Sequence, residues 1–349
     1  MIPYESRIAE LSAKVAQVKG RLGTGCVVLA HHYQRPEVVA AGDFRGDSLG
    51  LSRQAAASEA SHIVFCGVRF MAESAYILAR PGQTVLHPDP SSGCPMSDMA
   101  DIEDVDRAFA ELDETCGAGS FIPVTYVNSS AAVKAATGAR GGICCTSSNA
   151  LKVMKSVMET GKTIVFLPDE HLGANTARVI GFPEGSILRW DYSLPFGGNS
   201  QDGIRRARLI LWAGHCHVHT WFNTGHVAEA RRRFPGARVM VHPECRSGVV
   251  MAADASGSTE FMVNTVRESP AGSAFVIGTE LNLVRRLAAE NPGKTVVELS
   301  RSMCPNMFKI TLNKVLYTLE HLDSAGPVTV PEETRHHARQ ALQRMLDLS

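Results

Sequence analysis

The feature that most constrains the fold is an alternation of strand-like and helix-like segments that recurs in three rounds. Each round holds a helix start rich in Ser or Thr and, further on, a Cys that follows a strand-like apolar run. These two landmarks are 46 positions apart in the first and third rounds and 69 apart in the middle round: Ser48 and Cys94, Ser258 and Cys304, Ser147 and Cys216. The spacing predicts an internal threefold repeat whose middle copy has 23 additional residues.

Regular alternation of this kind predicts an α/β fold, in which parallel sheets are flanked by helices. We expect three similar αβα domains, each with a small parallel sheet. Packing around a pseudo-threefold axis would bring the carboxyl ends of their strands together. The extra residues of the middle copy are assigned to a Gly-, Pro-, Asn- and Ser-rich loop at about 191–206. The predicted segments are an N-terminal helix over 1–24, repeats over 25–115, 116–215 and 216–326, and a C-terminal helix over 327–349 that packs on the outside.

The balance of charge and the lack of long apolar runs exclude several classes of function. The chain has 35 Lys and Arg residues against 35 Asp and Glu residues, so no basic surplus indicates a nucleic-acid or membrane-surface partner. No apolar run approaches the ~20 residues needed to cross a bilayer, and the N-terminus has a polar helical pattern without a signal-peptide core. We therefore expect a cytoplasmic protein whose nine Cys residues serve as thiols or metal ligands rather than disulfides, although no Cys-x-x-Cys motif occurs.

Three Cys residues lie on three separate loops that follow strand-like runs. Cys94 follows Thr84–His87, Cys216 follows Leu209–Trp212, and Cys304 lies between Thr295–Leu299 and an amphipathic run over Met307–Leu322. A thiolate at a helix start faces the positive end of the helix dipole, which favours its ionised form. Three convergent thiolates suit zinc with an open fourth position, or an iron–sulfur cluster with one iron free of protein ligands. His215, His217 and His219 would favour zinc if they were ligands, but alternating His also fits the solvated face of a strand.

Polar side chains at the end of the first strand of each repeat supply candidate acid–base groups: His31 and Tyr33, Tyr126 and Asn128, His242 and Glu244. A Glu beside a His at a strand end fits a general base. Helix starts carry hydroxyl groups at Ser48, at Ser147 within Thr146–Asn149, and at Ser258 and Thr259. Helix N-termini bind anions, although Ser and Thr are also ordinary N-caps. Three convergent anion sites would suit substrates with several carboxylates or a phosphate.

The chain resembles the quinolinate synthase family in a series of ordered motifs that run from about residue 25 to 320. The matching stretches are Leu29-Ala30-His31-His32-Tyr33-Gln34, Gly46-Asp47-Ser48-Leu49, Cys66-Gly67-Val68-Arg69-Phe70-Met71-Ala72-Glu73-Ser74, Gly93-Cys94-Pro95-Met96, Tyr126-Val127-Asn128-Ser129-Ser130, Cys145-Thr146-Ser147-Ser148-Asn149-Ala150, Pro168-Asp169-Glu170-His171-Leu172, His242-Pro243-Glu244-Cys245 and Met303-Cys304-Pro305. So many motifs in the same order make a chance match very improbable.

The resemblance implies three similar α/β domains around a pseudo-threefold axis, with the active site at the centre. It implies a 4Fe-4S cluster with one open iron, held by Cys94, Cys216 and Cys304. The implied reaction condenses iminoaspartate with dihydroxyacetone phosphate to quinolinate, releasing phosphate and water, in NAD biosynthesis. An L-aspartate oxidase or aspartate dehydrogenase would supply iminoaspartate. The implied substrate-binding residues are His31, Ser48, Tyr126, Asn128, Ser147, His242, Glu244 and Thr259, and the implied catalytic residues are Glu244, Tyr33, Tyr126 and His242.

The sequence departs from the family pattern at two places. Some members carry a Cys-x-x-Cys-x-x-Cys run before the last ligand position, but only Cys304 is present here, so a redox disulfide is not expected. His32 stands where other side chains are common, and we expect little consequence. The remaining Cys residues are interpreted as non-ligands: Cys26, Cys66, Cys116, Cys144, Cys145 and Cys245.

Two other functions stay open on the residues alone. A zinc hydrolase or hydratase could use the same three thiols, and a non-catalytic small-molecule binding protein could be built from the same repeats. Iron and sulfide content separates the cluster enzyme from the zinc enzyme, whereas turnover separates both from the binding protein.

Overall fold

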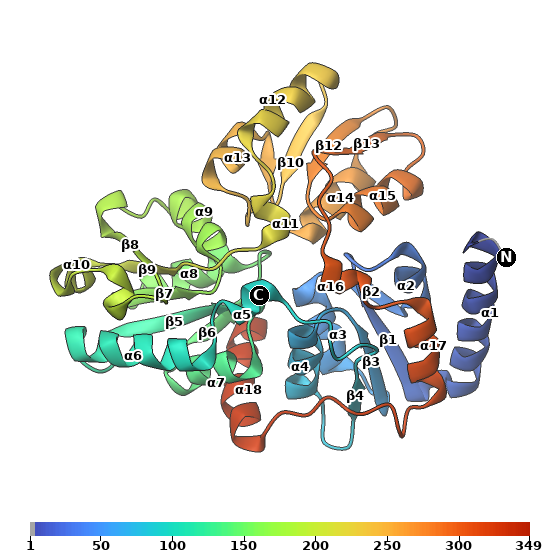
Figure 1. Ribbon diagram of the computed structural model, residues 1–349, viewed down its shortest axis with the longest axis horizontal. Helices are drawn as coiled ribbons and strands as arrows, with labels where there is room; N and C mark the ends of the chain where they lie inside the picture. Colours follow the sequence, from blue (N-terminus) through green and yellow to red (C-terminus); the bar gives the residue numbers. More distant parts are fainter. Residues whose placement is uncertain (1–3) are drawn as a thin grey trace.

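The computed structural model describes residues 4–349, which form three parallel sheets flanked by helices (Figure 1). The first sheet contains β1 Cys26–His31, β2 Phe44–Gly46, β3 His62–Cys66 and β4 Thr84–Leu86. The second contains β5 Phe121–Tyr126, β6 Ile143–Cys145, β7 Thr163–Leu167, β8 Ile187–Trp190 and β9 Leu209–Trp212. The third contains β10 Arg238–Val241, β11 Ala255–Ser256, β12 Ala274–Gly278 and β13 Thr295–Glu298. The predicted α/β class with three αβα units is confirmed, and we name the units first, second and third after their sheets.

The strand order supports the predicted repeat. The first and third sheets have the orders β2-β1-β3-β4 and β11-β10-β12-β13, and the second has β6-β5-β7-β9 followed by the additional edge strand β8. The strand that precedes each candidate thiol is therefore β4, β9 or β13, in the same position of its sheet. The middle copy is longer because it includes β8 and the segment after it. That segment, predicted as a loop at about 191–206, also contains a 3-10 turn, Pro195–Gly198, and the helix α10, Gln201–Arg206.

Helices connect the strands in all three units. Those of the first unit are α1 Tyr4–Leu22, α2 Pro36–Ala41, α3 Ser48–Ala57 and α4 Arg69–Leu78. α6 Ile102–Cys116, α7 Ala131–Ala139, α8 Ala150–Met158 and α9 Glu170–Ile180 belong to the second unit. α12 Thr224–Arg233, α13 Ser247–Ala252, α14 Thr259–Glu268 and α15 Leu281–Glu290 belong to the third. Most begin after a side chain that accepts an N–H of the first turn, as expected of N-caps: Asp47, Asp101, Ser130, Asp169, Asn223, Ser258, Glu280 and Thr311.

A short helix begins directly after each candidate thiol. These helices are α5 Pro95–Asp98, α11 His217–Thr220 and α16 Pro305–Phe308. Proline occupies the first helical position of α5 and α16, where its fixed φ and missing N–H are tolerated. The predicted amphipathic run over Met307–Leu322 is not a single helix, because α16 ends at Phe308 and Thr311 caps a second helix, α17 Leu312–Glu320.

The C-terminal helix α18, Glu332–Leu348, lies at the junction of the first and second units and packs there with one face, while its other face is exposed (Figure 1). Its apolar face is fully buried at Ala338, Ala341, Leu342 and Met345. These residues belong to one apolar cluster that also contains buried residues of the first two sheets. Gly138 of α7 permits the close approach, because a Cβ there would lie 1.9 Å from the carbonyl oxygen of His337.

The chain crosses between units near its end. α17 lies within the range predicted for the third repeat, 216–326, but packs on β1 and β3 of the first sheet through Val315 and Leu316. The repeat boundaries therefore stay predictions, and residues 1–3 of the predicted N-terminal segment lie outside the described residues. No helix among residues 4–349 is both long and apolar enough to cross a membrane.

Candidate active site

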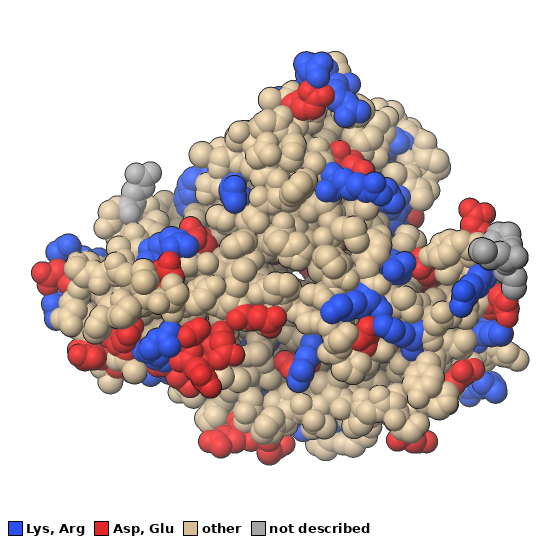
Figure 2. Space-filling model, in the orientation of Figure 1, with Lys and Arg blue, Asp and Glu red and all other residues tan. Residues whose placement is uncertain are grey.

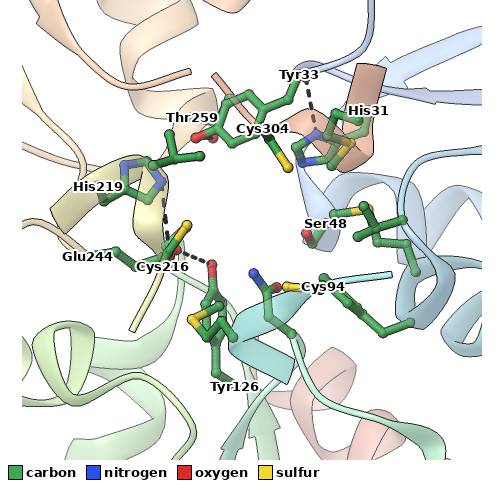
Figure 3. A pocket seen from close by; sticks show the side chains of 18 of the residues that line it. His31, Tyr33, Ser48, Cys94, Tyr126, Cys216, His219, Glu244, Thr259 and Cys304 are labelled. Carbon is green, nitrogen blue, oxygen red and sulfur yellow. Dashed lines mark hydrogen bonds and ion pairs between the residues drawn. The ribbon is translucent and has the colours of Figure 1, made fainter. Parts of the chain in front are cut away.

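The carboxyl ends of the three sheets converge on a central cavity, which Figure 3 shows from close by. The cavity encloses about 710 Å³ not filled by protein atoms, including the part open to solvent. Figure 2 shows a small opening where the three lobes meet, with charged side chains of both signs scattered over the surrounding face. Every residue predicted for the site lines this cavity: His31, Tyr33, Ser48, Cys94, Tyr126, Asn128, Ser147, Cys216, His242, Glu244, Thr259 and Cys304.

The three candidate thiols reach the cavity from three different units. Cys94, Cys216 and Cys304 are half-buried free thiols, and their sulfurs lie around the same hollow (Figure 3). Burial raises the pKa of Cys94 to about 12 and also raises the pKa of Cys304. The pKa of Cys216 is raised well above its usual value by burial, then by Glu244 and the other two thiols. The ionised forms of three buried thiols would repel one another, so they need a nearby positive charge. A metal centre bound by the thiols would supply that charge.

One corner of the cavity offers a second grouping of ligand atoms. Cys216, His219 and Glu244 each present one such atom, and these atoms all lie within 4.8 Å of one another. A thiolate, an imidazole and a carboxylate form a donor set that zinc accepts. The geometry therefore accommodates either a centre shared by the three thiols or a single ion held at this corner.

Glu244 and two tyrosines join different units across the cavity. The Tyr126 hydroxyl of the second unit donates to Glu244 Oε1 of the third at 2.6 Å. The Tyr33 hydroxyl of the first unit lies 2.7 Å from Thr279 Oγ1 and accepts from Thr259 Oγ1 at 3.2 Å. Burial raises the pKa of Glu244 to about 7 despite the Tyr126 hydrogen bond, and burial keeps the pKa of both tyrosines well above 10. Near neutral pH, Glu244 is therefore the group poised to exchange a proton.

Two buried histidines act as hydrogen-bonding groups without charge. Burial lowers the pKa of His31 and of His242 to about 3, so both are neutral at physiological pH. His31 Nδ1 accepts the Tyr33 backbone N–H at 3.1 Å, and His242 Nδ1 accepts the Glu244 backbone N–H at 3.4 Å. Because Nδ1 accepts in each ring, the hydrogen-bond pattern assigns the proton to Nε2, which leaves an N–H donor available to a ligand.

From the sequence, His219 is only one of three possible zinc ligands beside Cys216, and Thr279 is not among the candidate residues. His219 is buried, stacks on His242 with ring centroids 4.2 Å apart, and has Nε2 4.0 Å from Glu244 Oε2. The available signal was its spacing of three residues from Cys216, which places it on the same side of α11. Thr279 directly follows β12, so the strand-end pattern that found Tyr126 could have found it too.

The hydroxyl residues meet three helix N-termini in different ways. Ser48 and Thr259 are the first residues of α3 and α14, behind the caps Asp47 and Ser258. Ser147 instead lies in the turn before Asn149, so the prediction that it opens a helix was wrong, although it lines the cavity. Within residues 4–349 no Lys or Arg lines the cavity. Anions there would meet helix N-termini and neutral donors rather than cationic side chains.

The remaining cysteines do not line the cavity in the described part of the chain. Cys145 and Cys245 lie at strand ends but are fully buried in apolar clusters, and burial raises the pKa of both thiols. Their placement agrees with the interpretation of these thiols as non-ligands.

The fold and the cavity define a class of protein: a three-unit α/β protein with a central site built from thiols, neutral histidines and one perturbed carboxyl group. Residues 13–347 match the model of the family described as "Quinolinate synthetase A protein". A protein of Herpetosiphon aurantiacus named "Quinolinate synthase" is 45% identical, over 98% of this chain and 93% of that protein. "Quinolinate synthase" of Geobacillus kaustophilus is 45% identical over 98% and 94%, and that of Streptomyces coelicolor 45% over 97% and 88%. The chain therefore belongs to the quinolinate synthetase A family.

Proposed function

We propose that this protein is a quinolinate synthase, which condenses iminoaspartate with dihydroxyacetone phosphate to quinolinate and releases phosphate and water. One observation carries the proposal. In a chain of this family, Cys94, Cys216 and Cys304 line the same cavity as Glu244 and the residues predicted to bind substrate. The cofactor would be a 4Fe-4S cluster bound by the three thiols.

The donor set fits such a cluster. Three thiols and no fourth Cys line the cavity within the described residues, which leaves one iron without a protein thiolate. When bound, the cluster supplies that iron as a Lewis acid toward a substrate hydroxyl or carboxylate. The substrate carboxylates and phosphate would be held by the N-termini of α3 and α14, by Asn128 and Ser147, and by the Nε2–H donors of His31 and His242.

Glu244 would be the principal proton carrier of the reaction. A carboxyl group with a pKa near 7 both accepts and donates protons at neutral pH, which a sequence of condensation and dehydration steps requires. Tyr126, hydrogen-bonded to Glu244, would orient that carboxylate and pass protons to it. Tyr33 has a raised pKa and two threonine partners, so it suits a hydrogen-bond donor to substrate better than a base. His242, which accepts the Glu244 backbone N–H, would fix the position of this base.

Anaerobic purification followed by analysis and assay tests the proposal. We expect about four iron and four sulfide per chain, and quinolinate formation from the two substrates. Brown, iron-containing protein that forms no quinolinate would refute the activity. Colourless protein with one zinc would favour the rival zinc enzyme, for which the grouping of Cys216, His219 and Glu244 is the supporting observation.

The assigned base has its own test. Glu244→Gln keeps the shape of the side chain but cannot accept a proton, so we expect turnover to fall about 10²- to 10⁴-fold while the cluster is retained. Glu268→Gln, on the exposed end of α14, is the matched control and should keep full activity. A Glu244→Gln protein with an intact cluster and unchanged turnover would contradict the role.

We also propose where the substrate iminoaspartate comes from. Iminoaspartate hydrolyses readily, so an L-aspartate oxidase or an aspartate dehydrogenase would have to supply it close to the time of use. A cytoplasmic location and the lack of a nucleic-acid or membrane partner are expectations from the balanced charge of the chain.

A further inference from the structure

The three loops that carry the candidate thiols are tied to the protein by the same backbone contact. In each unit, the first residue of the helix after the third strand donates its N–H to the carbonyl two residues before the Cys. The pairs are Arg69 to Ser92 at 2.8 Å, Glu170 to Gly214 at 2.9 Å, and Leu281 to Ser302 at 2.9 Å. The N-cap residue of α4, α9 or α15 therefore lies beside the thiol loop of its own unit.

These N-cap residues differ between the units. α9 is capped by Asp169 and α15 by Glu280, whereas α4 begins after Val68, which has no capping side chain. Asp169 Oδ1 accepts the Leu172 N–H at 2.6 Å, and Glu280 Oε2 accepts the Asn282 N–H at 2.7 Å. A helix at this junction can therefore start without an acid, so capping alone does not explain the two carboxyl groups.

Both acids are fully buried, and each has one oxygen without a hydrogen-bond partner at normal geometry. Burial raises the pKa of both carboxyl groups, that of Glu280 to about 8, while the backbone N–H of Cys216 acts to lower the pKa of Asp169 and that of Cys304 acts to lower the pKa of Glu280. A buried carboxyl group with an incomplete set of hydrogen-bond partners is unfavourable for folding. Its presence behind two of the three thiols indicates a role at the site.

We propose that Asp169 and Glu280 are positioning residues, which hold the Cys216 and Cys304 loops through the Cys backbone N–H groups and keep both thiols directed at the cavity. In many proteins, residues that contact a metal ligand but not the metal itself orient that ligand. The inference rests on the proposed function in that the thiols are taken to bind the cluster. Neither acid lines the cavity, so both act through the thiol loops.

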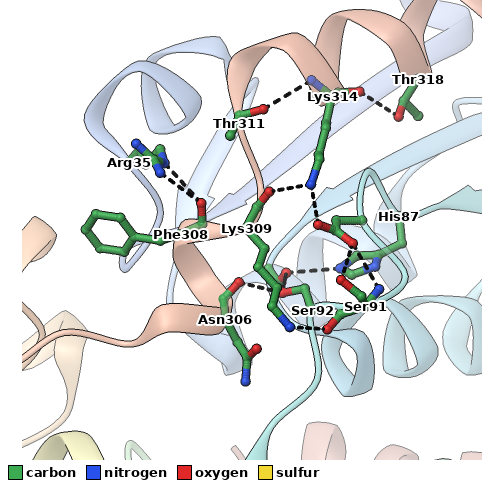
Figure 4. Close-up of polar contacts among 12 residues, drawn as sticks. Arg35, His87, Ser91, Ser92, Asn306, Phe308, Lys309, Thr311, Lys314 and Thr318 are labelled. Atoms are coloured by element: carbon green, nitrogen blue, oxygen red, sulfur yellow. Dashed lines mark hydrogen bonds and ion pairs between the residues drawn. The ribbon is translucent and has the colours of Figure 1, made fainter.

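The first unit shows why Cys94 does not need such an acid. The loop before Cys94 is held by hydrogen bonds and an ion pair with the segment that follows Cys304 (Figure 4). The contacts are Ser92 Oγ to the Asn306 carbonyl at 2.8 Å, Lys309 Nζ to the Ser91 carbonyl at 2.7 Å, and Lys314 Nζ to Asp89 Oδ2 at 2.5 Å. Ser302 Oγ makes the equivalent contact for the Cys304 loop, to the Val218 carbonyl at 2.8 Å. The two lysine contacts therefore distinguish the Cys94 loop, whereas an acid lies at the base of the Cys216 and Cys304 loops.

Thiol alkylation of the apo-protein tests the proposal without the cluster. Asp169→Ala should increase the rate at which iodoacetamide modifies Cys216 several-fold, and Glu280→Ala should do the same for Cys304. The rate at Cys94 serves as the reference within the same molecule. Asp169→Asn and Glu280→Gln keep an acceptor oxygen and should restore rates near those of the wild type. Unchanged rates in the Ala variants, or equal increases at all three thiols, would overturn the proposal.

Iron release from the cluster-loaded protein gives a second readout. We expect each Ala variant to lose iron to a chelator about 10- to 100-fold faster than the wild type, and the Asn and Gln variants to stay close to it. Asp101→Ala is the matched control, because Asp101 is an exposed acid that caps α6. Equal acceleration by Asp101→Ala would show general loosening and refute the specific role. Wild-type protein without iron would refute the proposed cofactor, while the alkylation pattern would still decide the positioning role.

Discussion

The first and second units share an apolar core, whereas the third unit is joined to them by polar contacts. One cluster includes Leu29 of the first sheet, Phe166 of the second and Leu342 of α18. Within residues 4–349, the two clusters of the third unit contain no buried residue from the first two sheets, and Tyr33 is the residue of the first unit that packs against one of them. In Figure 1, the long helix α18 lies at the junction of the first two lobes, whereas the short helices α11 and α16 lie where the third lobe meets them.

The polar contacts of the third unit include a chain of paired groups that reaches the first unit. His32 contacts Glu260 Oε2 at 3.2 Å through Nε2 and accepts from Arg286 at 2.8 Å through Nδ1. Glu290 pairs with both Arg286 and Arg45. The sequence alone predicts little consequence of His32, whereas the structure buries its side chain at this junction.

The difference between the two junctions suggests which part of the protein moves. The shared apolar core holds the first two units together as one body. Polar contacts can be replaced by hydrogen bonds to water, so separating the third unit costs less free energy than separating the first two. The hydrogen bond between Tyr126 and Glu244 and the contacts of Tyr33 all cross to the third unit. Movement of the third unit would therefore open the cavity and uncouple both tyrosines at once.

Leu342→Ala should have the largest effect, because it removes buried side-chain volume between the first two units. We expect the free energy of unfolding to fall by about 2–5 kcal/mol, as measured by urea denaturation. Leu151→Ala, at an exposed position of α8, is the control and should change stability little. Equal effects of the two substitutions would contradict the assignment of α18 to the shared core.

Arg286→Met should have an intermediate effect on stability, which we expect to be confined to the third unit. It removes the donor to His32 Nδ1 and leaves that buried atom without a partner, a loss of about 1–3 kcal/mol. Hydrogen exchange should accelerate in α14 and α15 while α18 keeps its protection. Arg285→Met, at the neighbouring exposed position, is the matched control. Faster exchange in α18 would show that the two junctions are not independent.

Acidification should have the smallest effect on stability. It should weaken the polar junction of the third unit and leave the apolar junction of the first two units unchanged. The pKa of Glu260 lies below its usual value of 4.5, chiefly because of its hydrogen bond with His32, with Arg267 contributing. A lowered pKa means that the pairing stabilises fully above pH 4.5 and is lost as the pH falls through the lower, folded-state value. Hydrogen-exchange protection, corrected for intrinsic rates, should then fall in α14 more than in α18. Glu260→Gln should abolish that difference, and a difference that persists would contradict the assignment.

Local patterns predicted most of the site, because each predicted group follows a strand and parallel strands end at one edge of a sheet. Cys94, Cys216 and Cys304 were found this way, and the structure places all three on one cavity. His219 was only one of three possible zinc ligands on sequence grounds, because its stacking on His242 depends on packing between segments distant in sequence. The amphipathic pattern of α18 showed that one face is buried but not which units cover it. The position of the edge strand β8 in its sheet could not be predicted from its sequence, because a strand of four residues does not specify its neighbour.

The absence of Lys and Arg from the cavity wall, within the described residues, bears on how phosphate would leave if the proposed reaction releases it there. Inorganic phosphate carries its charge after release as well as before, so a fixed cation would retain it. Helix N-termini and neutral donors attract anions over a short range and with a strong dependence on direction. We therefore expect phosphate to be a weak inhibitor of the proposed enzyme, and a small displacement of α3 or α14 should suffice to free it.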